Sequence, residues 1–334
     1  MCMKKVITGI KPTGTIHVGN YAGAIKPALQ FLESDEYTPL YFIANMHALN
    51  TVTDAELLRK QTLEIAATWL ALGLNPTQSL FYCQSDIPEL FELNWILANL
   101  TPKGLMNRAH AYKALVDKNT TMGLHRDDGV NMGLFNYPIL MSADILLFDA
   151  DLVPVGKDQI QHIEIARDLA QTFNQKYGET FASPEGYIEK DVAILPGLDG
   201  RKMSKSYNNV IPLFSEAAQL NKLIKQVKTD SSLPHEAKDP NTSPLFTLYQ
   251  AFAKDDEVLN MREHFRNGIG WGAVKDAVFE VMNRELTIPR EQFQNLVSKP
   301  KEIEDILQDG ATKARMIAKE KLIQIKERVG LLHI

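Results

Sequence analysis

Residues 202–206 read Lys-Met-Ser-Lys-Ser and follow a turn rich in Gly and Pro; we call them the lysine loop. Together with Arg201, Lys202 and Lys205 place three cationic side chains within five positions. Lysine is a compact charge on a flexible stem, which suits a loop that approaches a polyphosphate. A transition state at phosphorus gains negative charge, so cations that close on it lower the barrier selectively. The segment therefore favours chemistry at phosphorus, and a solvated basic loop is the alternative.

A second segment suited to phosphate follows the first predicted strand. Residues 10–20 read Ile-Lys-Pro-Thr-Gly-Thr-Ile-His-Val-Gly-Asn. Gly14 and Gly19 let a ligand approach the backbone closely, and His17 can donate a hydrogen bond to a phosphate. A helix that begins here adds backbone N–H donors. Because His-x-Gly-Asn is a short pattern, a tight turn with a structural histidine is the alternative interpretation.

Asp144 is a carboxylate inside an apolar stretch, since residues 145–148 are Ile-Leu-Leu-Phe. A buried carboxylate requires hydrogen-bond donors. It is either structural, as a helix N-cap or in an internal ion pair, or it accepts a hydrogen bond from a ligand. A ligand with one N–H donor and no acceptor, such as an indole, needs one acceptor in an apolar pocket.

Short β-branched or aromatic runs alternate with helical patterns as far as residue 211. The predicted strands are residues 5–10, 40–44, 80–83, 152–155 and 192–195. This alternation predicts an α/β fold with a doubly wound, mainly parallel sheet. One helix is predicted to begin at a capping box of Thr53 and Glu56 and to stop at Gly73, and another to cover residues 158–176. Pro27 is expected to kink the first helix or end its first segment.

Strand patterns disappear after about residue 212, and helical patterns replace them. The predicted helices are residues 220–227, 244–253, 274–286, 292–297 and 313–329. We therefore predict a catalytic domain at residues 1–211 with a connective insertion at about 84–135. An all-helical second domain follows at 212–310, and a C-terminal helix at 311–334 packs back on the first domain.

The net charge of −5 argues against a general nucleic-acid binder. The last 24 residues are nevertheless basic, with Lys313, Arg315, Lys319, Lys321, Lys326 and Arg328 against Glu320 and Glu327. This cluster is either a solvated helix face or a basic patch that meets RNA phosphates.

Further bulk features indicate a cytoplasmic protein. The 334 residues contain no apolar run near the ~20 residues of a membrane helix, and residues 1–12 do not resemble a signal peptide. The two cysteines, Cys2 and Cys83, can form neither a metal cluster nor a disulfide framework. We expect no protein-bound metal and no membrane partner.

The two phosphate-suited segments together resemble the class I aminoacyl-tRNA synthetases, whose signatures are similar to His-Ile-Gly-His and Lys-Met-Ser-Lys-Ser. The second signature is complete here, whereas Asn20 replaces the last histidine of the first. The resemblance implies a Rossmann-like class I fold and the binding of ATP, with Mg²⁺ held through the ATP phosphates. The catalytic residues it implies are His17, Lys113, Lys202, Ser204 and Lys205. The implied ATP contacts are Lys11, Thr13, Gly19, Asn20, Gly156, Asp158 and Met203.

Residues 133–147 and 153–162 resemble the bacterial tryptophanyl-tRNA synthetases. By that resemblance Tyr137 and Gln159 hold the ammonium of the amino acid, Met141 and Asp144 contact the indole, and His47 lines the pocket. Lys11 stands where many of these enzymes have glutamine, and residues 114–132 include a few extra residues relative to them.

The resemblance implies ATP-dependent activation of L-tryptophan to tryptophanyl-AMP and its transfer to tRNA(Trp), with the anticodon bound by the helical domain. It also implies a homodimer, for which the apolar segment 81–100 is the predicted interface. A tyrosyl-tRNA synthetase shares the fold and both signatures. A non-catalytic RNA-binding paralogue and a small-molecule nucleotidyltransferase are further alternatives, although the latter leaves the helical domain and the complete lysine loop unexplained.

Overall fold

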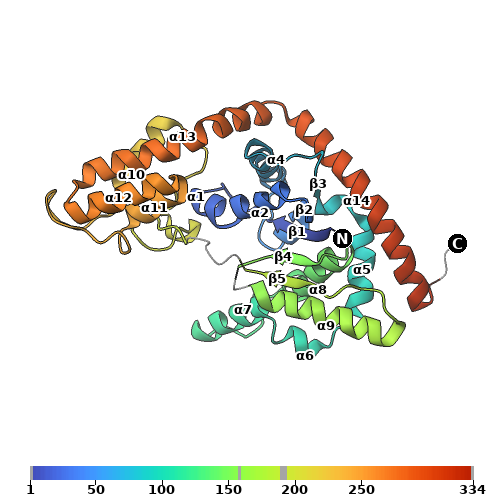
Figure 1. The fold of residues 1–334 in the computed structure, drawn as a ribbon. Helices are drawn as coiled ribbons and strands as arrows, with labels where there is room; N and C mark the ends of the chain where they lie inside the picture. Colours follow the sequence, from blue (N-terminus) through green and yellow to red (C-terminus); the bar gives the residue numbers. More distant parts are fainter. Residues whose placement is uncertain (1–2, 157–158, 189–193, 332–334) are drawn as a thin grey trace.

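A computed structural model describes residues 3–156, 159–188 and 194–331 (Figure 1). Its sheet has five parallel strands in the order β3-β2-β1-β4-β5. The strands are β1 (Lys4–Ile10), β2 (Tyr37–Ile43), β3 (Leu80–Cys83), β4 (Leu152–Pro154) and β5 (Glu185–Tyr187). The predicted doubly wound α/β fold is confirmed. Part of the strand predicted at 192–195 lies outside the described residues, and the described fifth strand, β5, was not predicted.

The strand order reverses direction beside β1. From β1 the chain adds β2 and β3 on one side, and it then returns to add β4 and β5 on the other side. In open parallel sheets, ligands bind in the crevice at the carboxyl ends of the strands on either side of such a reversal. In this chain, that crevice lies beyond Ile10 of β1 and Pro154 of β4.

Alternating residues of the strands pack on opposite faces of the sheet. Tyr41 and Phe81 face one core, which includes Trp69 of α4 (Ala55–Ala71). Phe42 and Tyr82 face the other core. The helices of this second core include α5 (Pro88–Ala98), α8 (Met132–Leu146) and α9 (Ile160–Tyr177). The short helices α6 (Lys103–Met106) and α7 (His110–Thr121) lie between α5 and α8 in the chain.

Two local predictions about helices differ in outcome. The side chain of Asp54 caps α4 by accepting from the N–H groups of Glu56 and Leu57, so the capping residue is not Thr53 as predicted. The break at Pro27 is confirmed. Helix α1 (Val18–Asn20) passes through a π-helical turn (Tyr21–Ile25) into α2 (Lys26–Gln30), whose first turn contains Pro27. Proline lacks an N–H, so it fits a first turn and interrupts a helix interior.

A helical unit follows the α/β part of the chain. It contains α10 (Ala217–Gln226), α11 (Pro244–Phe252), α12 (Asp255–Asn267) and α13 (Trp271–Val297). Helix α12 was not predicted, and the two helices predicted at 274–286 and 292–297 are one continuous helix despite Pro289. The unit packs against the α4 face of the sheet, since Val278 and Met282 belong to the same core as Trp69.

Helix α14 (Pro300–Val329) leaves α13 and runs back along the α/β part (Figure 1). It crosses the edge strand β3, where a Cβ on Gly310 would lie 1.9 Å from the carbonyl oxygen of Phe81. A helix over an edge strand blocks pairing with another chain. The predicted return of this helix is therefore observed. The helix is longer than predicted, and the expected boundary at 310/311 falls inside it.

Three of the C-terminal cations anchor α14 to the α/β part. Arg315 contacts the buried Glu89 at 2.9 Å, Lys321 contacts Asp149 at 2.6 Å, and Lys326 contacts Glu92 at 2.5 Å. Ion pairs within the chain therefore neutralise part of the basic cluster. This differs from both interpretations offered for it, a solvated face and a patch for RNA.

The segment predicted as a dimer interface is largely internal. Phe81, Leu90, Leu93 and Leu97 are buried within the chain, whereas Trp95 is 71% exposed on α5. Among the described residues, no helix is both long enough and apolar enough to span a membrane.

Candidate active site

The segment between β1 and α2 forms a closed turn around His17. The His17 Nδ1 accepts from the N–H of Asn20, and the Asn20 Oδ1 accepts from the N–H of His17, both at 3.2 Å. This reciprocal pair caps α1, so the two side chains of the His-x-Gly-Asn pattern hold each other. On its other side, the N–H of Val18 donates to the carbonyl of Ile211, just beyond the lysine loop. The histidine is therefore structural, and it also lies at the crevice.

The surroundings of His17 favour its neutral form. Burial and the nearby charge of Lys205 lower the pKa of His17 to about 4. A neutral imidazole with Nδ1 occupied presents Nε2–H as its free donor. Gly19 lies against the ring, because a Cβ there would be 3.0 Å from Nδ1. A donor beside a bare glycine is suited to an oxygen-rich ligand such as a phosphate.

The lysine loop is held over this turn. The Lys205 ammonium donates to the carbonyl of Thr13. The Met203 side chain is buried and anchors the loop, while Lys202 is exposed. Burial lowers the pKa of Lys205. The two signature segments, 192 residues apart between Thr13 and Lys205, are thus in direct contact.

Asn209 organises the base of the lysine loop, although no sequence pattern marks it. Its buried side chain donates to Asp199 at 2.7 Å and to the carbonyl of Lys202 at 3.2 Å. Its Oδ1 accepts from the N–H of Ser204 at 2.8 Å. One amide therefore connects the turn before the loop with the loop itself. The Ser204 hydroxyl lies 2.8 Å from that of Ser206.

Aromatic rings and a cation from four segments gather beside the loop. The Tyr137 ring lies 4.3 Å from the His47 ring and 5.3 Å from the His162 ring. The Lys11 ammonium lies 4.7 Å from the centre of the Tyr137 ring, and burial lowers its pKa. Gln159 extends the group, because its Oε1 lies 3.0 Å from Nδ1 of His162. The structure therefore brings Lys11, His47, Tyr137 and Gln159 together.

Asp144 lies at the bottom of this group. It is buried inside α8, whose N-cap is Asn131, so the N-cap interpretation is wrong. Its Oδ2 lies 3.0 Å from Nε2 of His47, and both of its oxygens accept from Gln84, at 2.8 and 2.9 Å. Burial raises the pKa of Asp144, against the lowering effect of the bonds from His47 and Gln84. Asp144 is therefore paired inside the chain, as one of the two interpretations predicted.

The remaining predicted site residues vary in position. Met141 lies half-buried on α8 one turn before Asp144. Gly156 follows β4 at the crevice, and its carbonyl accepts from the N–H of Gln159. Asp158 lies outside the described residues. Lys113 is exposed on α7, and no described hydrogen bond or ion pair joins it to the other site residues.

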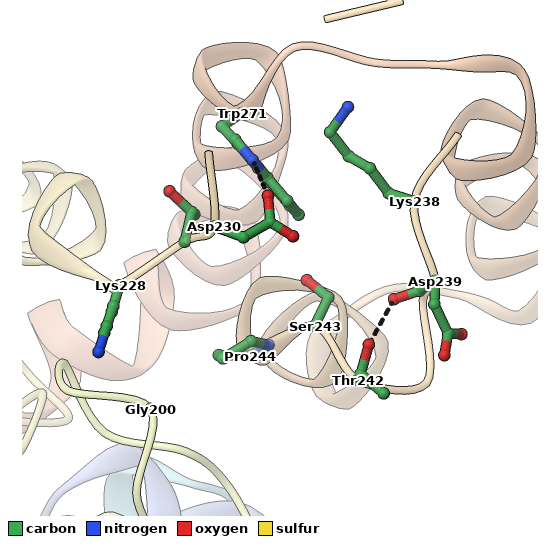
Figure 2. Close-up of a pocket in the computed structure, with 10 residues that line it drawn as sticks. Gly200, Lys228, Asp230, Lys238, Asp239, Thr242, Ser243, Pro244 and Trp271 are labelled. Atoms are coloured by element: carbon green, nitrogen blue, oxygen red, sulfur yellow. Dashed lines mark hydrogen bonds between the residues drawn. The ribbon is translucent and has the colours of Figure 1, made fainter. Parts of the chain in front are cut away.

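A separate cavity of about 270 Å³ lies between the turn before the lysine loop and the helical unit (Figure 2). Gly200 lines it on the loop side. On the helical side, the Trp271 indole donates to Asp230 at 3.0 Å, and the Lys238 ammonium lies 5.4 Å from the Trp271 ring. The cavity thus marks the junction between the loop and the helical unit.

Comparison with known proteins agrees with this geometry. The family model for class I tRNA synthetases (W and Y) matches residues 3–287. The chain is 52% identical to the tryptophan–tRNA ligase of Pseudomonas putida over 330 residues, 98% of this chain and 74% of that relative. It is 54% identical to the ligase of Bordetella parapertussis over 329 residues, 98% of this chain and 73% of that relative.

Solved structures agree as well. The tryptophanyl-tRNA synthetase of Campylobacter jejuni, crystallised with ADP and tryptophan, is 43% identical with a TM-score of 0.88 and covers 98% of this chain and 100% of its own. The fold and the two signature segments are those of a class I aminoacyl-tRNA synthetase. The chain belongs to the W and Y family of these enzymes. The relatives named above are tryptophan–tRNA ligases of this family.

Proposed function

We propose that this enzyme activates L-tryptophan with ATP and transfers the tryptophanyl group to tRNA(Trp). The observation that carries the substrate assignment is the buried Asp144, an acceptor that contacts His47, whose ring lies 4.3 Å from that of Tyr137. A buried acceptor fits an indole, which has one donor. A phenol both donates and accepts, and therefore needs a different partner. The identity to tryptophan–tRNA ligases supports the same choice over tyrosine.

In the first step, an oxygen of the tryptophan carboxylate attacks the α-phosphorus of Mg-ATP, and the bond to the β-phosphate oxygen breaks. The products are tryptophanyl-AMP and pyrophosphate. No side chain acts as a nucleophile, so catalysis depends on positioning and charge. Lys202 and Lys205 balance the charge that develops on the leaving pyrophosphate, with Ser204 beside them. His17 donates to a phosphate oxygen, and the Mg²⁺ enters with ATP through its phosphates.

The other binding roles follow from position. Thr13, Gly19, Asn20 and Met203 surround the place where the lysine loop meets the His17 turn, and we assign this place to ATP. Gly156 and Asp158 are assigned to the ribose, and Lys113 to a phosphate after a movement of α7. Tyr137 and Gln159 are assigned to the amino-acid ammonium, and His47 and Met141 to the sides of the indole.

In the second step, the tRNA terminal ribose hydroxyl attacks the tryptophanyl carbonyl and releases AMP. We assign the 2′-hydroxyl to this role and the helical unit α10–α13 to anticodon recognition. We further propose a cytoplasmic homodimer that uses the exposed Trp95 face of α5. Sedimentation at micromolar concentration tests the dimer: a dimer in wild type that becomes a monomer in Trp95→Glu supports it, and a monomeric wild type contradicts it.

The experiment that tests the proposed function is the charging of tRNA with labelled tryptophan or tyrosine in the presence of ATP. We expect tryptophan to be transferred to tRNA(Trp) and tyrosine to be transferred to no tRNA. Charging with tyrosine would instead identify the tyrosine enzyme. An absence of charging and of ATP–pyrophosphate exchange with both amino acids would identify a non-catalytic relative.

A further inference from the structure

Gln84 makes more polar contacts to Asp144 than any other described residue, although its sequence position does not suggest this. It follows strand β3, its side chain has no solvent exposure, and its amide nitrogen reaches both carboxylate oxygens of Asp144. A glutamine buried to this extent must have all its polar atoms satisfied. Its other contacts decide which way the amide faces.

The backbone of the short helix α3 (Asn45–Ala48) fixes the amide orientation. The Gln84 Oε1 accepts from the N–H of Met46 at 3.2 Å and from the N–H of His47 at 3.3 Å. Backbone N–H groups can only donate, so the oxygen must face them. The NH₂ group therefore has to face Asp144. The reverse orientation would place donors against donors and an oxygen against a carboxylate.

The same contacts favour the ionised form of Asp144, against the effect of its burial. A carboxylate offers about four acceptor directions, and Gln84 and His47 occupy three of them. His47 donates from Nε2, since its partner is an acceptor, and its Nδ1 has no hydrogen-bond partner among the described residues. With donors on both oxygens, a proton on Asp144 would displace one of these bonds. The remaining acceptor direction is then available only to a donor on the ligand.

We propose that Gln84 is a specificity-determining positioning residue, which keeps Asp144 ionised and aligned as the acceptor for the ring N–H of the amino acid. This inference rests on the proposed function, because it needs a substrate that donates one N–H. Gln84 acts through Asp144 and the α3 backbone. Its effect therefore appears in recognition of the amino acid and not in the transfer at phosphorus.

The test uses Gln84→Met, which keeps the length of the side chain and removes both its donor and its acceptor. Gln61→Met, at a buried glutamine on α4, is the matched control. ATP–pyrophosphate exchange gives kcat and KM between pH 6 and 9 for tryptophan and for the analogue with sulfur in place of the indole N–H. Circular dichroism and thermal unfolding verify that each variant folds.

For Gln84→Met we expect the KM for tryptophan to rise at least ~10-fold, equal to about 1.4 kcal/mol, with kcat changed by less than ~3-fold. The preference for tryptophan over the sulfur analogue should fall by a similar factor. The KM should rise further as the pH falls, because Asp144 then takes up a proton more readily. Gln61→Met should behave as the wild type.

If Gln84→Met has the same preference for tryptophan over the sulfur analogue as the wild type, and the same dependence of KM on pH, the inference is overturned. If this variant does not fold, Gln84→Glu replaces it, since one carboxylate oxygen can still accept from Met46 and His47. The added negative charge beside Asp144 should then strengthen the pH dependence, and an unchanged profile would again overturn the inference. A wild type without tryptophan-dependent exchange would contradict the proposed function instead, so the two failures are distinguishable.

Discussion

The amide of Asn209 donates to the carboxylate of Asp199 at 2.7 Å. This bond connects the chain just after the lysine loop with the turn just before it. The same side chain contacts the backbone of Lys202 and Ser204. The backbone of the loop that carries both lysines thus depends on a residue outside the Lys-Met-Ser-Lys-Ser pattern. Under the proposed function, an organised loop reduces the ordering needed when the lysines close on the phosphates.

Replacement of Asn209 with Ala should slow tryptophanyl-AMP formation by ~10- to 100-fold while changing the KM for tryptophan by less than ~3-fold, since misplaced catalytic groups affect the transition state most. Single-turnover kinetics of the activation step provide the measurement. Asn208→Gly is the control, because Asn208 is exposed and already has a left-handed backbone. Equal rates of tryptophanyl-AMP formation in the two variants would contradict the organising role of Asn209.

Lys205→Ala should slow tryptophanyl-AMP formation strongly, by at least ~100-fold, because a cation that meets the developing charge is lost. Tryptophan affinity should change little, since Lys205 contacts the carbonyl of Thr13 and not Asp144 or Tyr137. Rapid quench measures the first quantity and equilibrium binding the second. Lys118→Ala, at an exposed position on α7, is the control. Normal single-turnover activation in Lys205→Ala would refute the assigned role.

Asp144→Ala should reduce the preference for tryptophan over tyrosine and phenylalanine by at least ~100-fold. A site built around one polar contact can discriminate by ~10⁴-fold, and removal of the contact loses most of this factor. The ratio of kcat/KM values in pyrophosphate exchange is the measurement. Unchanged discrimination would show that the shape of the pocket, and not Asp144, selects the amino acid.

The lowered pKa of His17 predicts a loss of stability in acid. Its pKa is about 4 in the folded chain and ordinarily 6.5, so between these values the unfolded chain binds a proton that the folded chain does not. The free energy of unfolding should therefore fall as the pH decreases from 6.5 to 4, with roughly 2 kcal/mol of this contribution lost between pH 7 and pH 5. Urea unfolding of wild type and His17→Gln at the two pH values isolates this contribution. Identical pH dependence of the two proteins would contradict it.

Gly310→Ala should destabilise the fold by at least ~2 kcal/mol, because the new Cβ would meet the backbone of Phe81 and push α14 away from β3. Gly272→Ala is the matched control. It lies in helix α13 with no atom within 4 Å of the added Cβ, and alanine should stabilise it slightly. Thermal unfolding compares the two variants. A Gly310→Ala protein as stable as wild type would mean that α14 does not lie against β3.

Four of the five strands and the return of the C-terminal helix could be predicted, because each is marked by a local pattern. His17 and Lys205 were recognisable as candidate site residues because each lies in a motif. The strand β5 could not, since three residues that include Gly186 give no strand pattern. Helix α13 continues past Pro289, where the sequence suggested two helices. Packing of Val278, Met282 and Leu286 in the core favours one continuous helix despite the lost hydrogen bond.

The roles of Gln84 and Asn209 could not be predicted, for a different reason. Each is a single amide whose partners are set by packing, and Gln84 lies 60 residues from Asp144 in the chain. No local spacing reveals such a pair. Asp144 itself was recognisable because a carboxylate among apolar residues requires an explanation, whereas a glutamine after a strand does not. The C-terminal cations show the reverse case, since their pattern was visible but their acidic partners on α5 were not.

ATP–pyrophosphate exchange measured separately with each of the twenty amino acids identifies the substrate. We expect rapid exchange with tryptophan, and exchange with tyrosine and phenylalanine lower by orders of magnitude. Exchange that is fastest with tyrosine, or that occurs with none of the twenty, would overturn the assignment to tryptophan.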